Sequence, residues 1–154
     1  MDALDSTDLK ILRLLQHDAS LSATEVADQI GLSQSPCWRR INRMQQEGII
    51  KQQVAIVDRK KVGFDIVVLV NIKLSSHGRK MLDQFEAAIV DYPEVVECWT
   101  ISGSMDYMLR VVTQSIESYE HFLRSELLQL PHIHEAQSHF TMREVKNTTE
   151  LPLK

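Results

Sequence analysis

The chain has few of the residues from which disulfide scaffolds, zinc sites and membrane spans are built. Only two of its 154 residues are cysteine, Cys37 and Cys98, and they form no Cys-x-x-Cys pair. This argues against a disulfide framework or a zinc site and suits a reducing compartment. The longest apolar run, residues 66–70, is far shorter than a bilayer span. We therefore expect a cytoplasmic protein that needs no cofactor and enters no membrane.

Other signals of targeting and catalysis are also missing. Residues 1–8 are acidic and lack both the basic and the apolar region of a secretory signal. The five glycines form no phosphate-binding loop, and neither a nucleophile elbow nor spaced metal ligands are visible. His132 and His134 share one strand face, but a metal site would need a third ligand. We therefore predict that the protein is not an enzyme, and keep catalysis as the weaker alternative.

What the sequence does contain is a basic segment between two acidic ones. The net charge of −4 divides into −4 for residues 1–32, +5 for residues 33–61 and −5 for residues 62–154. A polyanion responds to the local field more than to the total charge. The basic segment therefore favours contact with nucleic acid, and a merely solvated charged surface is the alternative.

Helical patterns fill the first fifty residues. "LDSTDLKILRLL" has apolar residues at helical spacing, with Asp5 or Ser6 able to cap it and Asp8 adding negative charge to its first turn. A second helix is expected from about residue 22 to residue 30, where a Ser-x-x-Glu capping box begins it. Gly31 follows, as expected where a helix ends sharply.

A third helix begins almost at once, in "GLSQSPCWRR". With Ser33 or Ser35 as N-cap, Pro36 falls in the first turn, where its missing N–H costs nothing. Two helices joined by a short turn containing glycine predict a helix-turn-helix, whose second helix enters the DNA major groove. The expected DNA-binding residues are Gln34, Ser35, Trp38, Arg39, Arg40, Arg43 and Lys51.

These residues differ in their expected roles. Arg39 and Arg40 can bond guanine and Gln34 can bond adenine, whereas Arg43 suits a phosphate. Trp38 can instead pack beneath the helix as a core residue. "IIKQQVAIVD" predicts a pair of strands, a small wing that carries Lys51. A three-helix bundle with solvated arginines is the alternative to DNA binding.

A polar connector near residues 58–64 predicts two domains, 1–60 and 65–154, the second including a C-terminal tail. Strand and helix patterns then alternate as βαββαβ, the ferredoxin-like plan, so the fold class is α+β. The expected strands are 66–74, 94–102, 106–113 and 134–143, and the expected helices 78–93 and 115–131.

Two features of this second domain point to partners. Both helices can cover only one face of the sheet, and Val67 and Leu69 lie on the other, which predicts a homodimer with two-fold symmetry. Between the second and third strands, Gly103 can bring backbone N–H groups near a ligand and Asp106 places a carboxylate beside them. A free amino acid needs both groups. The alternative is that Asp106 only caps its own turn.

Taken together, these motifs resemble the Lrp/AsnC family, the feast/famine regulators. The resemblance extends from "LDSTDLKILRLL" through "SPCWRR" and "SGSMDY" to "EVKNTTELPL", nearly the whole chain. It implies a transcriptional regulator that binds double-stranded DNA as a homodimer, often in rings of dimers. It also implies an effector, usually an amino acid, bound near the "SGSMDY" loop.

Carried over to this chain, the resemblance assigns effector binding to Gly103, Ser104, Asp106 and Tyr107, although strand alternation can place Tyr107 in the core. One departure is His132, which stands where relatives commonly have glycine. The predicted function is a regulator whose effector changes its oligomeric assembly and thereby its DNA binding. An architectural DNA-binding protein that senses nothing is the alternative.

Overall fold

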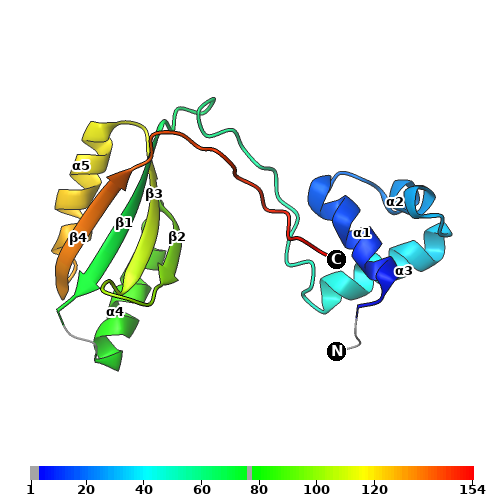
Figure 1. The fold of residues 1–154 in the computed structure, drawn as a ribbon, viewed down its shortest axis with the longest axis horizontal. Helices are drawn as coiled ribbons and strands as arrows, with labels where there is room; N and C mark the ends of the chain where they lie inside the picture. The colour runs from blue at the N-terminus through cyan, green and yellow to red at the C-terminus, as the bar shows by residue number, and fades with distance from the viewer. Residues whose placement is uncertain (1–3, 76–77) are drawn as a thin grey trace. The chain divides into compact units, whose positions relative to one another are not determined.

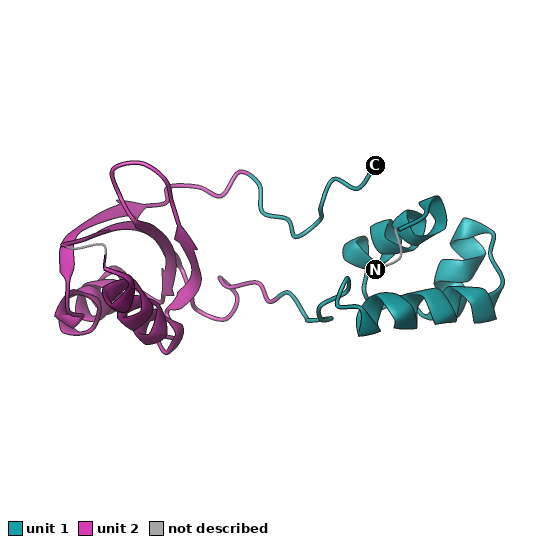
Figure 2. Ribbon diagram, turned by 90° about the horizontal axis from the view of Figure 1, so that it is seen from below, with its two compact units in different colours: residues 1–56, 146–154 teal, residues 57–145 magenta. Residues whose placement is uncertain are grey.

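The computed structural model describes residues 4–75 and 78–154, which divide into two compact units (Figure 1). Residues 1–56 and 146–154 form unit 1, and residues 57–145 form unit 2 (Figure 2). The boundary lies just before the predicted connector. The tail 146–154, which the sequence assigned to the second domain, belongs to unit 1 because its hydrogen bonds are to a helix of that unit. None of the described helices is long and apolar enough to cross a bilayer.

Unit 1 is a bundle of three short helices. They are α1 (Ser6–His17), α2 (Ala23–Ile30) and α3 (Gln34–Gln46). One apolar stripe from each helix packs into a common core, formed by Ile11, Leu15, Val26, Ala27, Cys37 and Met44. This burial compensates for the low intrinsic stability of helices of this length.

The helix boundaries follow the predicted signals. Asp5 caps α1, and the capping box of Ser22 and Glu25 begins α2. Gly31 ends α2 in the left-handed conformation, with φ +68°, which only glycine adopts at little cost. Ser33 is the N-cap of α3, so Pro36 lies in the first turn as expected. The helix-turn-helix prediction is confirmed.

The predicted wing is not formed. No strand precedes residue 66 in the described chain, and residues 51–57 are exposed coil. Val54 and Ile56 are 62% and 78% exposed, so the described residues of a single chain offer this segment no apolar surface to pack against. A two-stranded ribbon is only marginally stable without such support, which explains why the strand-like sequence does not form one.

Unit 2 has the predicted βαββαβ order. Its strands are β1 (Ile66–Leu74), β2 (Val95–Thr100), β3 (Tyr107–Thr113) and β4 (Ile133–Phe140); its helices are α4 (Arg79–Val90) and α5 (Ile116–Ser125), with a short 3₁₀ turn η1 (Leu127–Gln129). The strands pair antiparallel in the order β2-β3-β1-β4, the ferredoxin-like arrangement.

Both helices of unit 2 cover the same face of the sheet (Figure 1). Alternate residues of β1 point into the core, where they meet helix residues: Val68, Val70, Ile72 and Leu74 from the strand, Phe85, Ile89, Tyr119 and Phe122 from the helices. Val67 and Leu69 lie on the opposite face, as the alternation predicts.

Candidate functional site

One side of the N-terminal half of α3 is exposed, as a DNA-reading helix requires, while Cys37 on the other side lies in the core. Gln34, Ser35 and Arg39 are exposed, and Trp38 is 57% exposed, so its indole is not a core residue. Arg39 makes no hydrogen bond or ion pair within the described residues. Its guanidinium is therefore available to an external acceptor.

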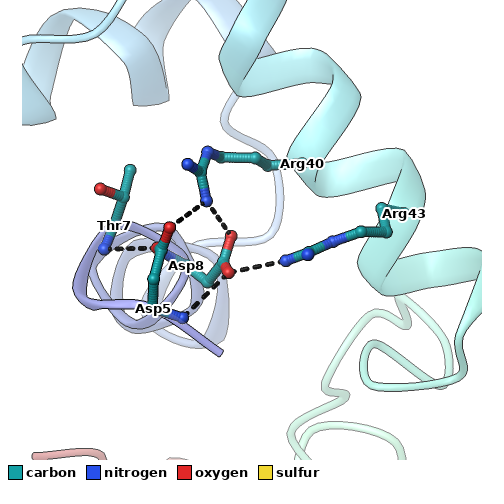
Figure 3. Close-up of polar contacts among 5 residues, drawn as sticks. All are labelled: Asp5, Thr7, Asp8, Arg40 and Arg43. Carbon is teal, nitrogen blue, oxygen red and sulfur yellow. Dashed lines mark hydrogen bonds and ion pairs between the residues drawn. The ribbon is translucent and has the colours of Figure 1, made fainter. Parts of the chain in front are cut away.

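Arg40 and Arg43 are placed differently, because both bind acidic residues at the start of α1, the N-cap Asp5 and Asp8 (Figure 3). Arg40 Nη1 donates to Asp5 Oδ2 at 2.7 Å and to Asp8 Oδ1 at 2.8 Å. Arg43 Nη2 donates to Asp8 Oδ2 at 2.6 Å. The Asp8 side chain is fully buried, and each arginine side chain keeps 32% of its surface exposed. We call Asp5, Asp8, Arg40 and Arg43 the carboxylate clamp.

The hydrogen bonds of the carboxylate clamp favour the ionised form of both of its aspartates. Burial alone would raise the pKa of Asp8, but hydrogen bonds from Arg40, the Asp5 backbone and Arg43 outweigh burial and lower it. The Asp8 backbone N–H and Arg40 likewise lower the pKa of Asp5. Asp8 is therefore ionised at neutral pH and fixes α3 against α1.

Sequence reasoning treated Asp8 only as a charge at a helix start and missed this function. A signal was present. The acids of α1 are three residues apart, and so are the bases Arg40 and Arg43 of α3. Residues at that spacing lie on one helix face, so two complementary pairs can meet when the helices pack.

A hollow of about 400 Å³ lies beside the clamp. It is lined by Asp5, Pro36, Arg39, Arg40 and Arg43. Three guanidinium groups and only one carboxylate, that of Asp5, thus line this concave surface, so its net charge is positive. Such a surface is suited to an anionic group such as a phosphate oxygen, with Arg39 adaptable and the other two arginines held in place.

The second candidate region is the loop between β2 and β3. Gly103 has φ +121°, a conformation that other residues rarely adopt, and Ser104 is exposed. Asp106 Oδ2 accepts the backbone N–H of Leu74 at 2.8 Å, at the end of β1. Asp106 therefore does more than cap its own turn, because its carboxylate fixes the loop to the neighbouring strand.

Tyr107 does not line this loop. Its side chain is 2% exposed, packs against Phe85 at 4.6 Å between ring centroids, and donates to Glu86 Oε1 at 2.8 Å. Burial and the nearby carboxylate raise the pKa of Tyr107. The strand alternation that placed Tyr107 in the core is correct, and the role in effector binding implied by the resemblance does not fit this position.

The remaining residues singled out in the sequence are Lys51, His132 and the candidate metal ligands. Lys51 is exposed just after α3. His132 has φ +72°, the one positive value at a non-glycine position in residues 4–75 and 78–154. No three His, Cys, Asp or Glu side chains in those residues are grouped as metal ligands.

Comparison with known families matches both units. The model of the Lrp/AsnC ligand binding domain covers residues 67–151. A model of a winged helix-turn-helix DNA-binding domain covers residues 4–51. The first match spans more than half of the chain and includes the loop that holds Gly103 and Asp106.

Individual proteins match over nearly their full length. The transcriptional regulator AzlB of Bacillus subtilis is 41% identical over 97% of this chain and 96% of its own. The crystal structure of an AsnC family transcriptional regulator from Agrobacterium tumefaciens is 41% identical, with a TM-score of 0.93 and 97% coverage of both chains. A transcriptional regulator of Neisseria meningitidis, solved as a complex with L-Met, is 32% identical, with a TM-score of 0.94, covering 98% of this chain and 97% of that one.

Proposed function

The chain belongs to the Lrp/AsnC family of DNA-binding transcriptional regulators, and on this premise we propose that an amino acid controls its binding to specific DNA sites. The observation that carries the proposal is the different use of three arginines on one helix. Asp8 fixes Arg40 and Arg43, while Arg39 stands exposed on the half of α3 that reads bases.

In this proposal α3 lies in the major groove. Arg39 reads a guanine edge and Gln34 an adenine edge, with Ser35 and Trp38 beside them. Arg40 and Arg43 use the donors that the clamp leaves free to bind phosphates, and Lys51 adds a further phosphate contact. The carboxylate clamp positions α3 before DNA arrives, which lowers the entropic cost of binding.

The proposed effector site is the loop 102–106. Gly103 and Ser104 offer N–H and hydroxyl groups to the carboxylate of an amino acid, and Asp106 supplies negative charge near its ammonium. The relative from Neisseria meningitidis, which matches over both units, was solved with an amino acid. This supports the chemical class of effector without specifying which amino acid binds here.

The proposed assembly is a homodimer through the open face of the sheet, with dimers joining into larger oligomers. The face carries Val67, Leu69 and Trp99, of which Trp99 is 43% exposed. The effector shifts the population between assemblies and so changes the spacing of the paired DNA-binding units. Because chromosomal DNA is the proposed partner, we expect the protein to act in the cytoplasm.

The test is fluorescence anisotropy on the DNA upstream of the protein's own gene, at two salt concentrations, with and without all twenty amino acids. We expect tight, salt-sensitive binding whose Kd shifts with the amino-acid pool. Binding that ignores the pool would favour an architectural protein that senses nothing. The enzymatic alternative is set aside, because the family and its named relatives are transcriptional regulators.

The loop is tested with Asp106→Ala. We expect DNA affinity to stay within about twofold of the parent while the effector-induced shift falls by about tenfold or more. Asp91→Ala, at the end of α4, is the matched control because it also removes one carboxylate from unit 2. An unchanged response in Asp106→Ala would remove this residue from the effector site.

A further inference from the structure

The last nine residues of the chain return to the unit that begins it. Residues 146–154 come after β4 in the sequence, yet they belong to unit 1, as their colour in Figure 2 indicates. The chain therefore passes between the two units twice, once at residues 56–57 and again at residues 145–146. Unit 1 is attached by two segments rather than by one linker.

The attachment is a set of hydrogen bonds to the C-terminal half of α1. The Gln16 side chain donates to the Leu151 carbonyl at 2.9 Å and accepts the Leu151 N–H at 3.0 Å. Arg13 Nε donates to the Leu153 carbonyl at 3.2 Å, and His17 Nδ1 lies 3.0 Å from Glu150 Oε1. Gln16 and His17 lie three and four positions after Arg13, so both are neighbours of Arg13 on the surface of α1.

The tail has local structure that suits this docking. Glu150 N–H donates to Thr148 Oγ1 at 3.1 Å, and Leu153 N–H donates to the Leu151 carbonyl at 2.8 Å. Pro152 lies between the two leucines, where its ring restricts φ and lowers the entropy that docking costs. The two hydrogen bonds of Gln16 to the backbone N–H and C=O of one residue, Leu151, resemble those of a strand pairing and recognise the backbone rather than a side chain.

Helix α1, which binds the tail, also binds the recognition helix α3, but through Asp8 rather than through Gln16. Asp8, buried in unit 1, binds Arg40 and Arg43 of α3, whereas Gln16 binds the tail. Helix α1 thus contacts the C-terminal tail and the DNA-reading helix at once. A helix is a stiff element, so a contact at one of its ends constrains the other.

We propose that the C-terminal tail is a strap that docks on α1 and couples the effector unit to the recognition helix. This inference rests on the proposed function, because it specifies how an effector bound to unit 2 changes DNA binding by unit 1. When the strap is docked, the freedom of unit 1 is limited by two connections. When the strap is released, unit 1 is connected to unit 2 by one linker only, and a conformational change in unit 2 no longer affects α3.

The docking is tested by amide hydrogen exchange on the full-length protein, on Gln16→Ala, and on a chain ending at Asn147. Both altered proteins should exchange the last-turn amides of α1 about fivefold faster or more, and the amides at the start of α3 should also accelerate. Lys10→Ala is the matched control, an exposed residue of the same helix. Unchanged exchange in both altered proteins would overturn the strap.

The coupling is tested by DNA anisotropy with and without the amino-acid pool. If the parent responds, Gln16→Ala and the shortened chain should still bind DNA, but their effector-induced shift should fall by about threefold or more. An equal shift in all three proteins would overturn the coupling while leaving the proposed function intact. If the parent itself ignores every amino acid, the proposed effector response fails, and hydrogen exchange still decides whether the strap exists.

Discussion

Asp8 shows how much one side chain can determine in a domain this small. Its carboxylate is fully buried, yet it is stable as an anion because two guanidinium groups and the Asp5 backbone N–H donate to it. A buried charge without such partners would cost several kcal/mol, so each partner depends on the others. Arg40 and Arg43 consequently have a structural role in addition to any contact with DNA.

Asp8→Asn should destabilise unit 1 by about 1–3 kcal/mol at neutral pH, because the neutral amide cannot replace both charge-assisted bonds. The folded state lowers the pKa of Asp8 below its ordinary value of 3.8. Its stabilisation is therefore present above that value and is lost as the pH falls through the folded pKa. Chemical unfolding at pH values between about 6 and about 3 should show the parent and variant converging. A constant difference would contradict the ionic role of Asp8.

Arg39 and Arg40 should respond differently to replacement. Arg39→Ala should cost about 1–3 kcal/mol on the specific site and relax its sequence preference, with little change in stability. Arg40→Ala should lower the stability of unit 1 as well, because it removes a partner of Asp5 and Asp8. Anisotropy on specific and scrambled DNA, together with thermal unfolding, separates the two effects. An equal loss on both DNAs for Arg39→Ala would refute base reading.

His132 carries a local strain that glycine would relieve. Its φ of +72° costs a residue with a Cβ about 1 kcal/mol, whereas glycine adopts it freely. His132→Gly should therefore be neutral or should stabilise unit 2 by up to about 1 kcal/mol, despite the extra entropy of the unfolded glycine. Thermal unfolding measures this directly. A loss above about 1 kcal/mol would mean that the imidazole makes a compensating contact.

Among the elements, those fixed by local signals could be predicted from the sequence. The ends of α2 depend on a Ser-x-x-Glu box and on Gly31, and the start of α3 on Ser33 and Pro36, all within a few residues. The strands of unit 2 were predictable because alternate residues of β1 are apolar on the core face.

The elements that depend on distant partners could not be predicted. The segment 51–57 has the residues of a strand, but it pairs with no strand among the described residues of the single chain, and its sequence alone does not reveal this. The carboxylate clamp joins Asp8 to residues more than thirty positions away, and the tail contacts Gln16 across more than 130 positions. The local periodicity of the sequence does not predict such long-range pairings. The matching three-residue spacing of the two acids and the two arginines is the one sequence feature that indicated the clamp.

The turn between α2 and α3 offers a test at the scale of one element. Gly31→Ala should destabilise unit 1 by about 1 kcal/mol, because φ +68° is unfavourable for alanine. Apart from the adjoining residues of the chain, no described atom lies within 4 Å of the added Cβ, so the cost is conformational and not a clash. Gly78→Ala, which has an ordinary φ and an equally open environment, is the matched control. Equal unfolding free energies for the two variants would contradict the argument.

At the scale of the whole molecule, the interface that we propose for the homodimer is the open face of the sheet. On β1 this face carries Val67 and Leu69, and Leu69 lies between Arg110 on β3 and His139 on β4. Arg110 Nε is 3.5 Å from Glu97 Oε2, so charged residues frame the apolar centre. An apolar centre with a polar surround is the usual composition of a protein interface.

Leu69→Lys should therefore convert the proposed dimer into a monomer. The substitution places a second cation beside Arg110, and two-fold symmetry would bring the same charge from the partner into an apolar interface. Ile56→Lys is the matched control, since Ile56 is 78% exposed in the coil that follows α3. Light scattering after gel filtration gives the mass of each protein. A monomeric parent, or a Leu69→Lys variant of unchanged mass, would rule out this face as the dimer interface. If only Leu69→Lys dissociates, we also expect it to bind a two-fold DNA site more weakly, because its DNA-binding units no longer act as a pair.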